Sequence, residues 1–295
     1  MFHLESIDQK NMKDNRIINK KYDEERALYG IENAHLLECA FEGPADGESA
    51  LKESKHIIVE NCNFHLRYPL WHVQDLHMSF SYFAVTARAP LWYCTNAKIE
   101  KCKMFGVKAV RECKDFTILD SEIESPEFGW KSDDITLERT KITAEYLFLD
   151  SKNIKLKNVT MFGKYSFQYV ENLTIENSNL DTKDAFWHSK NVVVRDSIIK
   201  GEYLAWFSDK LTLINCKIIG TQPFCYCKNL KLINCTMEKC DLAFEYSDVE
   251  AEINSHVDSI KNPRSGIIHV QSVGEIIMKD AVMGCHGVVE IINKK

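Results

Sequence analysis

The sequence predicts an all-β fold, a single-stranded, right-handed parallel β-helix with about 12 rungs of 19 residues. The first observation behind this prediction is a repeat that returns every 19 residues, with one step of 21 between Gln74 and Thr95. A period this short predicts stacked units, each of which buries its apolar face only against its neighbours. The units begin at Lys55, Gln74, Thr95, Lys114, Asp133, Lys152, Glu171, Lys190, Asp209, Lys228 and Ser247.

The second observation is the alternation of residue types inside each unit. The third and fifth residues are apolar in every unit, as at Leu211 and Leu213, whereas the residue between them varies, as at Lys98 and Thr174. Such alternation is typical of a β-strand that buries one face. Each unit is therefore expected to contribute one strand with an apolar side toward the core.

The third observation is a bend residue on either side of that strand. The second residue is Asp or Asn in nine of the eleven units, and a later position repeatedly holds Asn, as at Asn177 and Asn215. Both residue types tolerate left-handed backbone and hydrogen-bond to it locally. Each rung is therefore expected to hold about three short strands. A leucine-rich repeat is disfavoured, because 19 residues leave little room for a strand, a helix and two connections.

The repeat also sets the expected domain organisation, which is one solenoid. Residues 1–31 are charged and non-repetitive, and we expect them to cap the first coil. Residues 32–256 are predicted to form the β-helix repeats. Residues 257–295, in which the period breaks, are expected to hold an irregular segment, a last rung and a C-terminal cap.

Composition excludes several classes of partner and suggests a compartment. The net charge of −6 and the absence of a basic stripe argue against nucleic-acid binding. No apolar stretch is long enough to span a membrane, so no membrane partner is expected. The charged residues at the N-terminus are not followed by the apolar run of a signal peptide. We therefore expect a cytoplasmic protein.

The eleven cysteines are interpreted as fillers of small slots. Cys62 and Cys216 share one repeat position with Ser81 and Ser178, and a second position also alternates between cysteine and serine. A residue that is interchangeable with serine between rungs fills space, as free cysteine does well. The Cys225 and Cys227 pair lacks the spacing of a zinc site. No metal and no cofactor are expected.

Two neighbouring apolar columns carry the functional argument. All five tryptophans, Trp71, Trp92, Trp130, Trp187 and Trp206, lie three residues before a unit start. The position before them holds Leu70, Leu91, Val110, Phe148, Phe167, Phe186, Ala205 and Phe224. Adjacent strand residues point to opposite faces, so one column is internal and the other forms an exposed apolar stripe. An internal tryptophan stack and an outward sugar-binding platform both remain open here.

Polar residues beside these columns are the candidates for chemistry. Carboxylates and a histidine lie near the aromatic residues, at Asp150, Asp184, His188 and Glu202. These groups suit acid–base work, and glycoside chemistry requires two carboxyl groups that flank the bond. The candidate binding residues are Trp71, Trp92, Trp130, Phe167, Phe186, Trp187, Trp206, Tyr165 and Tyr203. A solvated turn without function is the alternative interpretation of the polar set.

Several segments resemble those of an uncharacterised bacterial family, the domain of unknown function 3737. They are ERALYG (25–30), GESALKES (47–54), RYPLW (67–71), RAPLWY (88–93), DAFW (184–187), GEYLAW (201–206) and LAFEYS (242–247). The family is grouped with the pectin-lyase-like right-handed β-helices, and the resemblance covers nearly the whole chain. It implies the fold and a bacterial cytoplasmic origin, and it implies no catalytic residue.

Two functions from different classes are compatible with the sequence. The first is a carbohydrate-binding or carbohydrate-active β-helix with an oligosaccharide ligand. If such a protein is an enzyme, it resembles a glycoside hydrolase or a polysaccharide lyase. The second is a non-enzymatic scaffold or homo-oligomer that uses the exposed stripe as a subunit interface.

Overall fold

The computed structural model describes residues 15–292, which form strands and turns without a helix. The predicted parallel β-helix is confirmed, with about 15 turns of about 19 residues instead of about 12. No helix of these residues is long and apolar enough to cross a membrane. The chain divides into two compact units, Met1–Ile142 and Thr143–Lys295, which are described separately below as unit 1 and unit 2.

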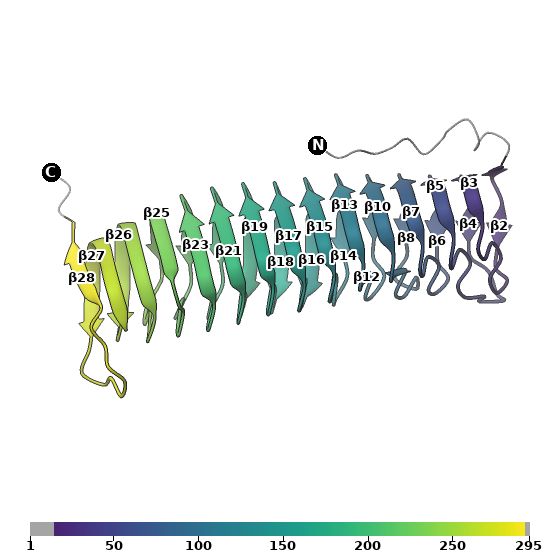
Figure 1. Ribbon diagram of the computed structural model, residues 1–295. Coiled ribbons are helices and arrows are strands. Elements are labelled where there is room, and N and C mark those ends of the chain that lie inside the picture. Colours follow the sequence, from purple (N-terminus) through teal and green to yellow (C-terminus); the bar gives the residue numbers. More distant parts are fainter. Residues whose placement is uncertain (1–14, 293–295) are drawn as a thin grey trace. The chain divides into compact units, whose positions relative to one another are not determined.

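Unit 1 contains three rows of parallel strands (Figure 1). The first row is β1 (Arg16–Ile18), β3 (Glu32–Leu37), β5 (Lys55–Glu60), β7 (Gln74–Ser79), β10 (Thr95–Glu100), β13 (Lys114–Leu119) and β15 (Asp133–Glu138). The second row is β2 (Lys21–Tyr22), β4 (Ala40–Phe41), β6 (Asn63–Phe64), β8 (Tyr82–Phe83), β11 (Lys103–Met104) and β14 (Glu122–Glu124). A third, short row pairs β9 (Leu91–Trp92) with β12 (Val110–Arg111).

Unit 2 repeats the first two rows, and β16 (Lys141–Glu145) lies at the division between the units. Its first row is β17 (Lys152–Lys157), β19 (Glu171–Glu176), β21 (Lys190–Arg195), β23 (Asp209–Ile214), β25 (Leu230–Glu238), β26 (Asp248–Lys261), β27 (Ser265–Ile277) and β28 (Val288–Ile291). The second row is β18 (Thr160–Lys164), β20 (Asn179–Lys183), β22 (Ile198–Lys200) and β24 (Lys217–Ile219).

The stacked strands extend beyond both limits expected for the repeat. Of the segment expected to cap the first coil, residues 1–14 lie outside the described residues, whereas β1 and β2 already pair with β3 and β4. At the other end, β26 continues past residue 256, and β27 and β28 add further parallel pairs. The C-terminal coils are hard to recognise in the sequence because their spacing departs from 19, as in the pairing of Asp248 with Ser265.

Equivalent residues of successive coils are hydrogen-bonded partners. Lys152 pairs with Glu171, and Glu171 pairs with Lys190, each one repeat further along the chain. The predicted bends are confirmed, since Asn153, Asn172 and Asn191 have φ angles of 54°, 60° and 54°. Their side chains form a ladder, in which the amide of Asn172 donates to Asn153 (3.0 Å) and that of Asn191 donates to Asn172 (3.2 Å).

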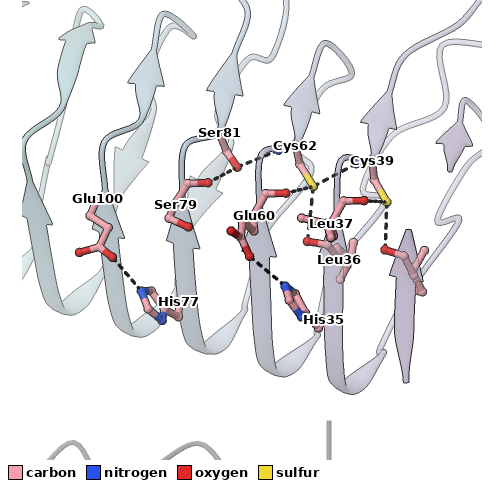
Figure 2. Close-up of polar contacts among 11 residues, drawn as sticks. His35, Leu36, Leu37, Cys39, Glu60, Cys62, His77, Ser79, Ser81 and Glu100 are labelled. Atoms are coloured by element: carbon pink, nitrogen blue, oxygen red, sulfur yellow. Dashed lines mark hydrogen bonds and ion pairs between the residues drawn. The ribbon is translucent and has the colours of Figure 1, made fainter. Parts of the chain in front are cut away.

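The cysteines occupy the small slots that the sequence predicts. Figure 2 shows Cys39, Cys62 and Ser81 following three neighbouring strands of unit 1. The backbone N–H of Cys62 donates to the Ser81 hydroxyl at 3.0 Å, so one coil's slot residue receives a hydrogen bond from the preceding coil. All eleven cysteines are free thiols, and all but Cys285 are buried. Burial raises the pKa of Cys62 to about 12 and that of Cys102 to about 11.

This burial predicts the reactivity of the thiols. Only the half-buried Cys285 should react rapidly with a bulky thiol reagent in the native protein, because burial shields the other thiols. All eleven should react once the protein is unfolded without reductant. Mass spectrometry of the labelled protein counts the thiols that react in the native and in the unfolded protein. Rapid native labelling of several thiols, or fewer than eleven in the unfolded chain, would contradict the packing described here.

Candidate functional site

The column of apolar residues that precedes the tryptophans lies inside the coils. Its members are Leu70, Leu91, Val110, Phe148, Phe167, Phe186, Ala205 and Phe224, and all are buried. Phe167 and Phe186 retain 0 % and 2 % of their exposure and stack on each other with ring centroids 5.1 Å apart. Their expected place in a binding surface is therefore corrected, because a ring enclosed by the coil cannot contact an outside ligand.

The tryptophan column lies on the outer side. All five tryptophans are half-buried, and neighbouring indoles stack nearly parallel, with centroids 5.2 Å apart for Trp71 and Trp92 and 5.4 Å apart for Trp187 and Trp206. The Nε1–H of Trp187 donates to the backbone oxygen of Tyr203 at 2.7 Å, and that of Trp206 donates to Gln222 at 3.0 Å. An internal tryptophan stack is excluded by this exposure, and such hydrogen bonds to the next coil fix the orientation of Trp71, Trp92, Trp187 and Trp206.

A second aromatic ladder runs beside the tryptophans of unit 2. His188 stacks between Tyr169 (4.9 Å) and Phe207 (5.0 Å), and Phe207 stacks on Tyr226 (4.8 Å). Tyr169 and Phe207 are 54 % and 44 % exposed. We call the surface formed by Tyr169, Trp187, His188, Trp206, Phe207 and Tyr226 the aromatic face of unit 2.

Positive backbone angles bring both ladders to the outside. Trp187 and His188 are adjacent in sequence, yet both keep exposed surface. His188 and Phe186 have φ angles of 56° and 62°, in the left-handed region, so the side chains do not alternate as they would along a strand. The alternation rule for strands correctly predicts that Phe186 and Trp187 point to opposite sides. It fails for His188, which points outward like Trp187.

Stacking determines which parts of the rings a ligand can reach. Because neighbouring rings cover one another's faces, most of the aromatic face presents ring edges. Trp206 differs, since the next residue of its column is the small, buried Cys225. Apart from its stacking on Trp187, Trp206 makes only edge-on or tilted ring contacts, with Tyr203 (5.6 Å, 80°), Phe207 (6.5 Å, 77°) and Tyr226 (6.4 Å, 68°). Trp206 therefore has one ring face on which no other ring stacks.

Two of the four candidate catalytic groups lie together. The ammonium of Lys183 is 3.9 Å from a carboxylate oxygen of Asp184 and 3.8 Å from one of Glu202. The Asp184 side chain is only 10 % exposed, and this burial, assisted by the charge of Glu202, raises the pKa of its carboxyl group. In the same column, Tyr165 precedes Asp184 by one coil and Tyr203 follows it. Tyr165 stacks on Tyr146, whereas Tyr203 meets Trp206 edge-on at 5.6 Å.

The other two candidate groups are not brought to this pair. Asp150 is exposed and belongs to the same column as His188, but Tyr169 lies between them in that column. His188 is held by its ring contacts with Tyr169 and Phe207. No three His, Cys, Asp or Glu side chains within residues 15–292 could hold a metal ion. Of the four candidate catalytic residues, Asp184 and Glu202 therefore form a pair, whereas Asp150 and His188 lie apart from it.

Cations that complete the tryptophan column of unit 1 were not anticipated from the sequence. The Lys52 ammonium lies 6.0 Å from the Trp71 ring centroid, and the Arg111 guanidinium lies 5.1 Å from that of Trp92 and 5.2 Å from that of Trp130. Lys52 and Arg111 occupy the same repeat position as the tryptophans. Their presence in the column was the available signal, and it also indicated that the column faces solvent.

The raised pKa of Asp184 gives a testable dependence of stability on pH. The Asp184→Asn variant should be more stable than the wild type at pH 7, because the ionised carboxylate is costly in its buried position. The difference should be absent below the unfolded pKa of about 3.9. It should grow as the pH rises through the elevated folded pKa and then become constant.

Denaturant unfolding at several pH values measures this difference. Asp150→Asn is the control, since an exposed substitution should change the free energy of unfolding by less than about 0.5 kcal/mol at every pH. A pH-independent effect of Asp184→Asn would contradict the assignment.

Comparison with solved structures finds similarity at low sequence identity. The surface adhesin PfbA of Streptococcus pneumoniae is 9 % identical, covers 88 % of this chain and 83 % of its own, and has a TM-score of 0.48. The tailspike protein of E. coli bacteriophage HK620, solved with a hexasaccharide, is 9 % identical with 88 % and 59 % coverage and a TM-score of 0.42. The mannuronan C-5 epimerase AlgE4 A-module of Azotobacter vinelandii is 8 % identical with 81 % and 88 % coverage and a TM-score of 0.36.

Sequence comparison identifies the family. No curated protein sequence matches the chain. Residues 15–291, which include most of both units and the whole aromatic face, match the family described as "Protein of unknown function (DUF3737)". The chain therefore belongs to the DUF3737 family.

Proposed function

We propose that this protein is a non-catalytic β-helix that binds an extended carbohydrate on the aromatic face of unit 2. The observation that carries the proposal is a fixed, exposed row of rings with polar groups along its border. Sugars present apolar C–H surfaces and hydroxyl groups side by side, so they require both kinds of partner. Aromatic side chains supply the apolar surface, and tyrosine hydroxyls add polar contacts.

The aromatic face is preformed, which favours binding. Hydrogen bonds to the next coil hold Trp187 and Trp206, and stacking holds His188 and Phe207. Side chains that are already ordered lose little conformational entropy when a ligand binds. Most of the conformational entropy of these side chains is therefore lost when the protein folds, and little more is lost when a ligand binds.

The polar border supplies directional contacts. Gln168 lies in the tryptophan column, where its amide donates to the backbone oxygen of Asp184 at 3.1 Å. Asp184, Glu202 and Lys183 lie together near Tyr203, whose ring contacts Trp206. Carboxylate, ammonium and hydroxyl groups beside an aromatic surface are the few polar groups with which a binding site orients its ligand.

Binding without hydrolysis is favoured by the arrangement of the carboxylates. A glycosidase requires two carboxyl groups on opposite sides of the scissile bond, with space between them for the sugar and, in inverting enzymes, for water. The Lys183 ammonium lies within 4 Å of both Asp184 and Glu202, so the two carboxylates already share one cation. His188 and Asp150, the other candidate acid–base groups, do not belong to the pair.

A second candidate function is a scaffold that self-associates through the same face. Two large apolar side chains, Tyr169 and Phe207, are about half exposed on it. Aromatic residues of this kind are enriched in protein–protein interfaces. The row of stacked ring edges would also suit a second protein surface.

We also propose that the protein works in a reducing compartment such as the cytoplasm. Eleven cysteines without a disulfide support this location, since disulfides persist mainly in oxidising compartments.

Two substitutions test carbohydrate binding. Trp206→Leu removes an indole with one face on which no other ring stacks, and Phe207→Ala removes an exposed ring of the second ladder. Each should weaken oligosaccharide binding about 10-fold, the effect of losing roughly 1.4 kcal/mol of aromatic contact. A glycan array identifies the ligand, and calorimetric titration measures the affinity of each variant.

Phe162→Ala is the matched control for Phe207→Ala. Phe162 belongs to β18 in unit 2 and is 41 % exposed, close to the 44 % of Phe207, but it lies outside the aromatic face. It should leave affinity unchanged. Light scattering examines the scaffold alternative in parallel. A chain that binds no glycan but forms an oligomer that Phe207→Ala dissociates would reject the carbohydrate proposal and support self-association.

A further inference from the structure

Arg111 is held between two tryptophans in unit 1. Its guanidinium carbon lies 5.1 Å from the Trp92 ring centroid and 5.2 Å from the Trp130 ring centroid. Trp92 stacks in turn on Trp71, with the ring planes only 3° apart. A planar guanidinium stacks well on aromatic faces, so the two indoles fix its position from both sides. β12, which ends at Arg111, pairs with β9 and sets the height of the side chain along the coils.

The guanidinium has donors that the described part of the chain does not use. An arginine carries five N–H donors, and within residues 15–292 the Arg111 side chain makes no hydrogen bond. Its Nε is buried without a partner. The Oε1 atom of Glu112 lies 3.7 Å from that Nε, beyond hydrogen-bond distance. The side chain keeps 23 % of its exposure, so its Nη groups are the donors left to an outside ligand.

Other arginines use the same fork internally. In unit 1, Arg139 donates from Nε and Nη2 to the two carboxylate oxygens of Asp120, at 2.6 Å and 3.0 Å. In unit 2, Arg264 pairs with Asp248 in the same two-point manner. A planar two-point contact with a carboxylate is the strong form of arginine recognition. Arg111 is placed for such a contact, and no carboxylate of the described residues makes a two-point contact with it, since Glu112 approaches only its Nε, at 3.7 Å.

We propose that Arg111, held between Trp92 and Trp130, binds the carboxylate group of a small acidic ligand of the uronic acid type. The carboxylate would accept two hydrogen bonds from the Nη groups, while the C–H groups beside it contact the indole edges. Indole edges carry the positive part of the ring quadrupole, which also favours an anion. The nearby Lys108 and Glu127 neutralise each other at 3.1 Å. The site belongs to unit 1 alone and stands whether or not the aromatic face of unit 2 binds a sugar.

Titration with glucuronate tests the site, with glucose and inorganic phosphate as comparison probes. Each tryptophan gives one indole N–H resonance, so NMR can locate the binding. Glucuronate should shift the resonances of Trp92 and Trp130, glucose should not, and added salt should weaken the effect because the contact is ionic. Shifts of equal size with glucose, or tighter binding of phosphate than of glucuronate, would overturn the assignment to a carboxylate.

Variants separate the role of Arg111 from a general effect of charge. Arg111→Lys keeps the charge but loses the planar fork, and should weaken glucuronate binding at least about 10-fold. Arg139→Lys is the matched control, since the Arg139 fork is already used by Asp120. Glu112→Gln removes the neighbouring competing carboxylate and should strengthen binding several-fold. Unchanged affinity in Arg111→Lys would refute the proposal. If Arg111→Lys does not fold, unchanged affinity in Glu112→Gln would refute it instead.

Discussion

The in-register hydrogen bonding of successive coils is the constraint on which the rest of this structure depends. Thr95 pairs with Lys114, and Lys190 pairs with Asp209, each with the residue one repeat away. Residues at equivalent positions of successive coils are therefore in direct contact, through their side chains as well as their backbone. The asparagine ladder and the cysteine and serine slots satisfy polar groups between successive coils. A residue that does not fit its column disturbs two neighbouring coils at once.

The columns also explain how the outer surface acquires its character. Phenylalanine has no polar atom and forms the internal stack, whereas each tryptophan has an N–H that needs a partner. On the outer side the carbonyl oxygens of the next coil provide that partner, as Tyr203 does for Trp187. Left-handed backbone at His188 then adds a second ring ladder beside the first. Both ladders are stiff because they follow from the stacking of the backbone.

The sequence was sufficient to predict the repeat, the bends at Asn172 and Asn191 and the slot cysteines, because each depends on one position within the repeat. It did not decide whether Phe186 or Trp187 faces inward, since both columns are apolar. The presence of Arg111 and Gln168 in the tryptophan column could have decided this, because charged and amide side chains avoid a core. The grouping of Asp184 with Glu202 through Lys183 depends on contacts between coils, which a position in the repeat does not reveal.

The central claim is that rings one repeat apart are immediate neighbours on the aromatic face of unit 2. Paired cysteine substitutions test it most directly, because a disulfide requires Cα atoms about 4.4–6.8 Å apart. Strand neighbours are separated by about 4.8 Å. Tyr169→Cys with His188→Cys should therefore form a disulfide under mild oxidation, detected by mass spectrometry after proteolysis. Tyr169→Cys with Phe207→Cys, two coils apart, should not. Cross-linking of the second pair in preference to the first would contradict the register and the surface built on it.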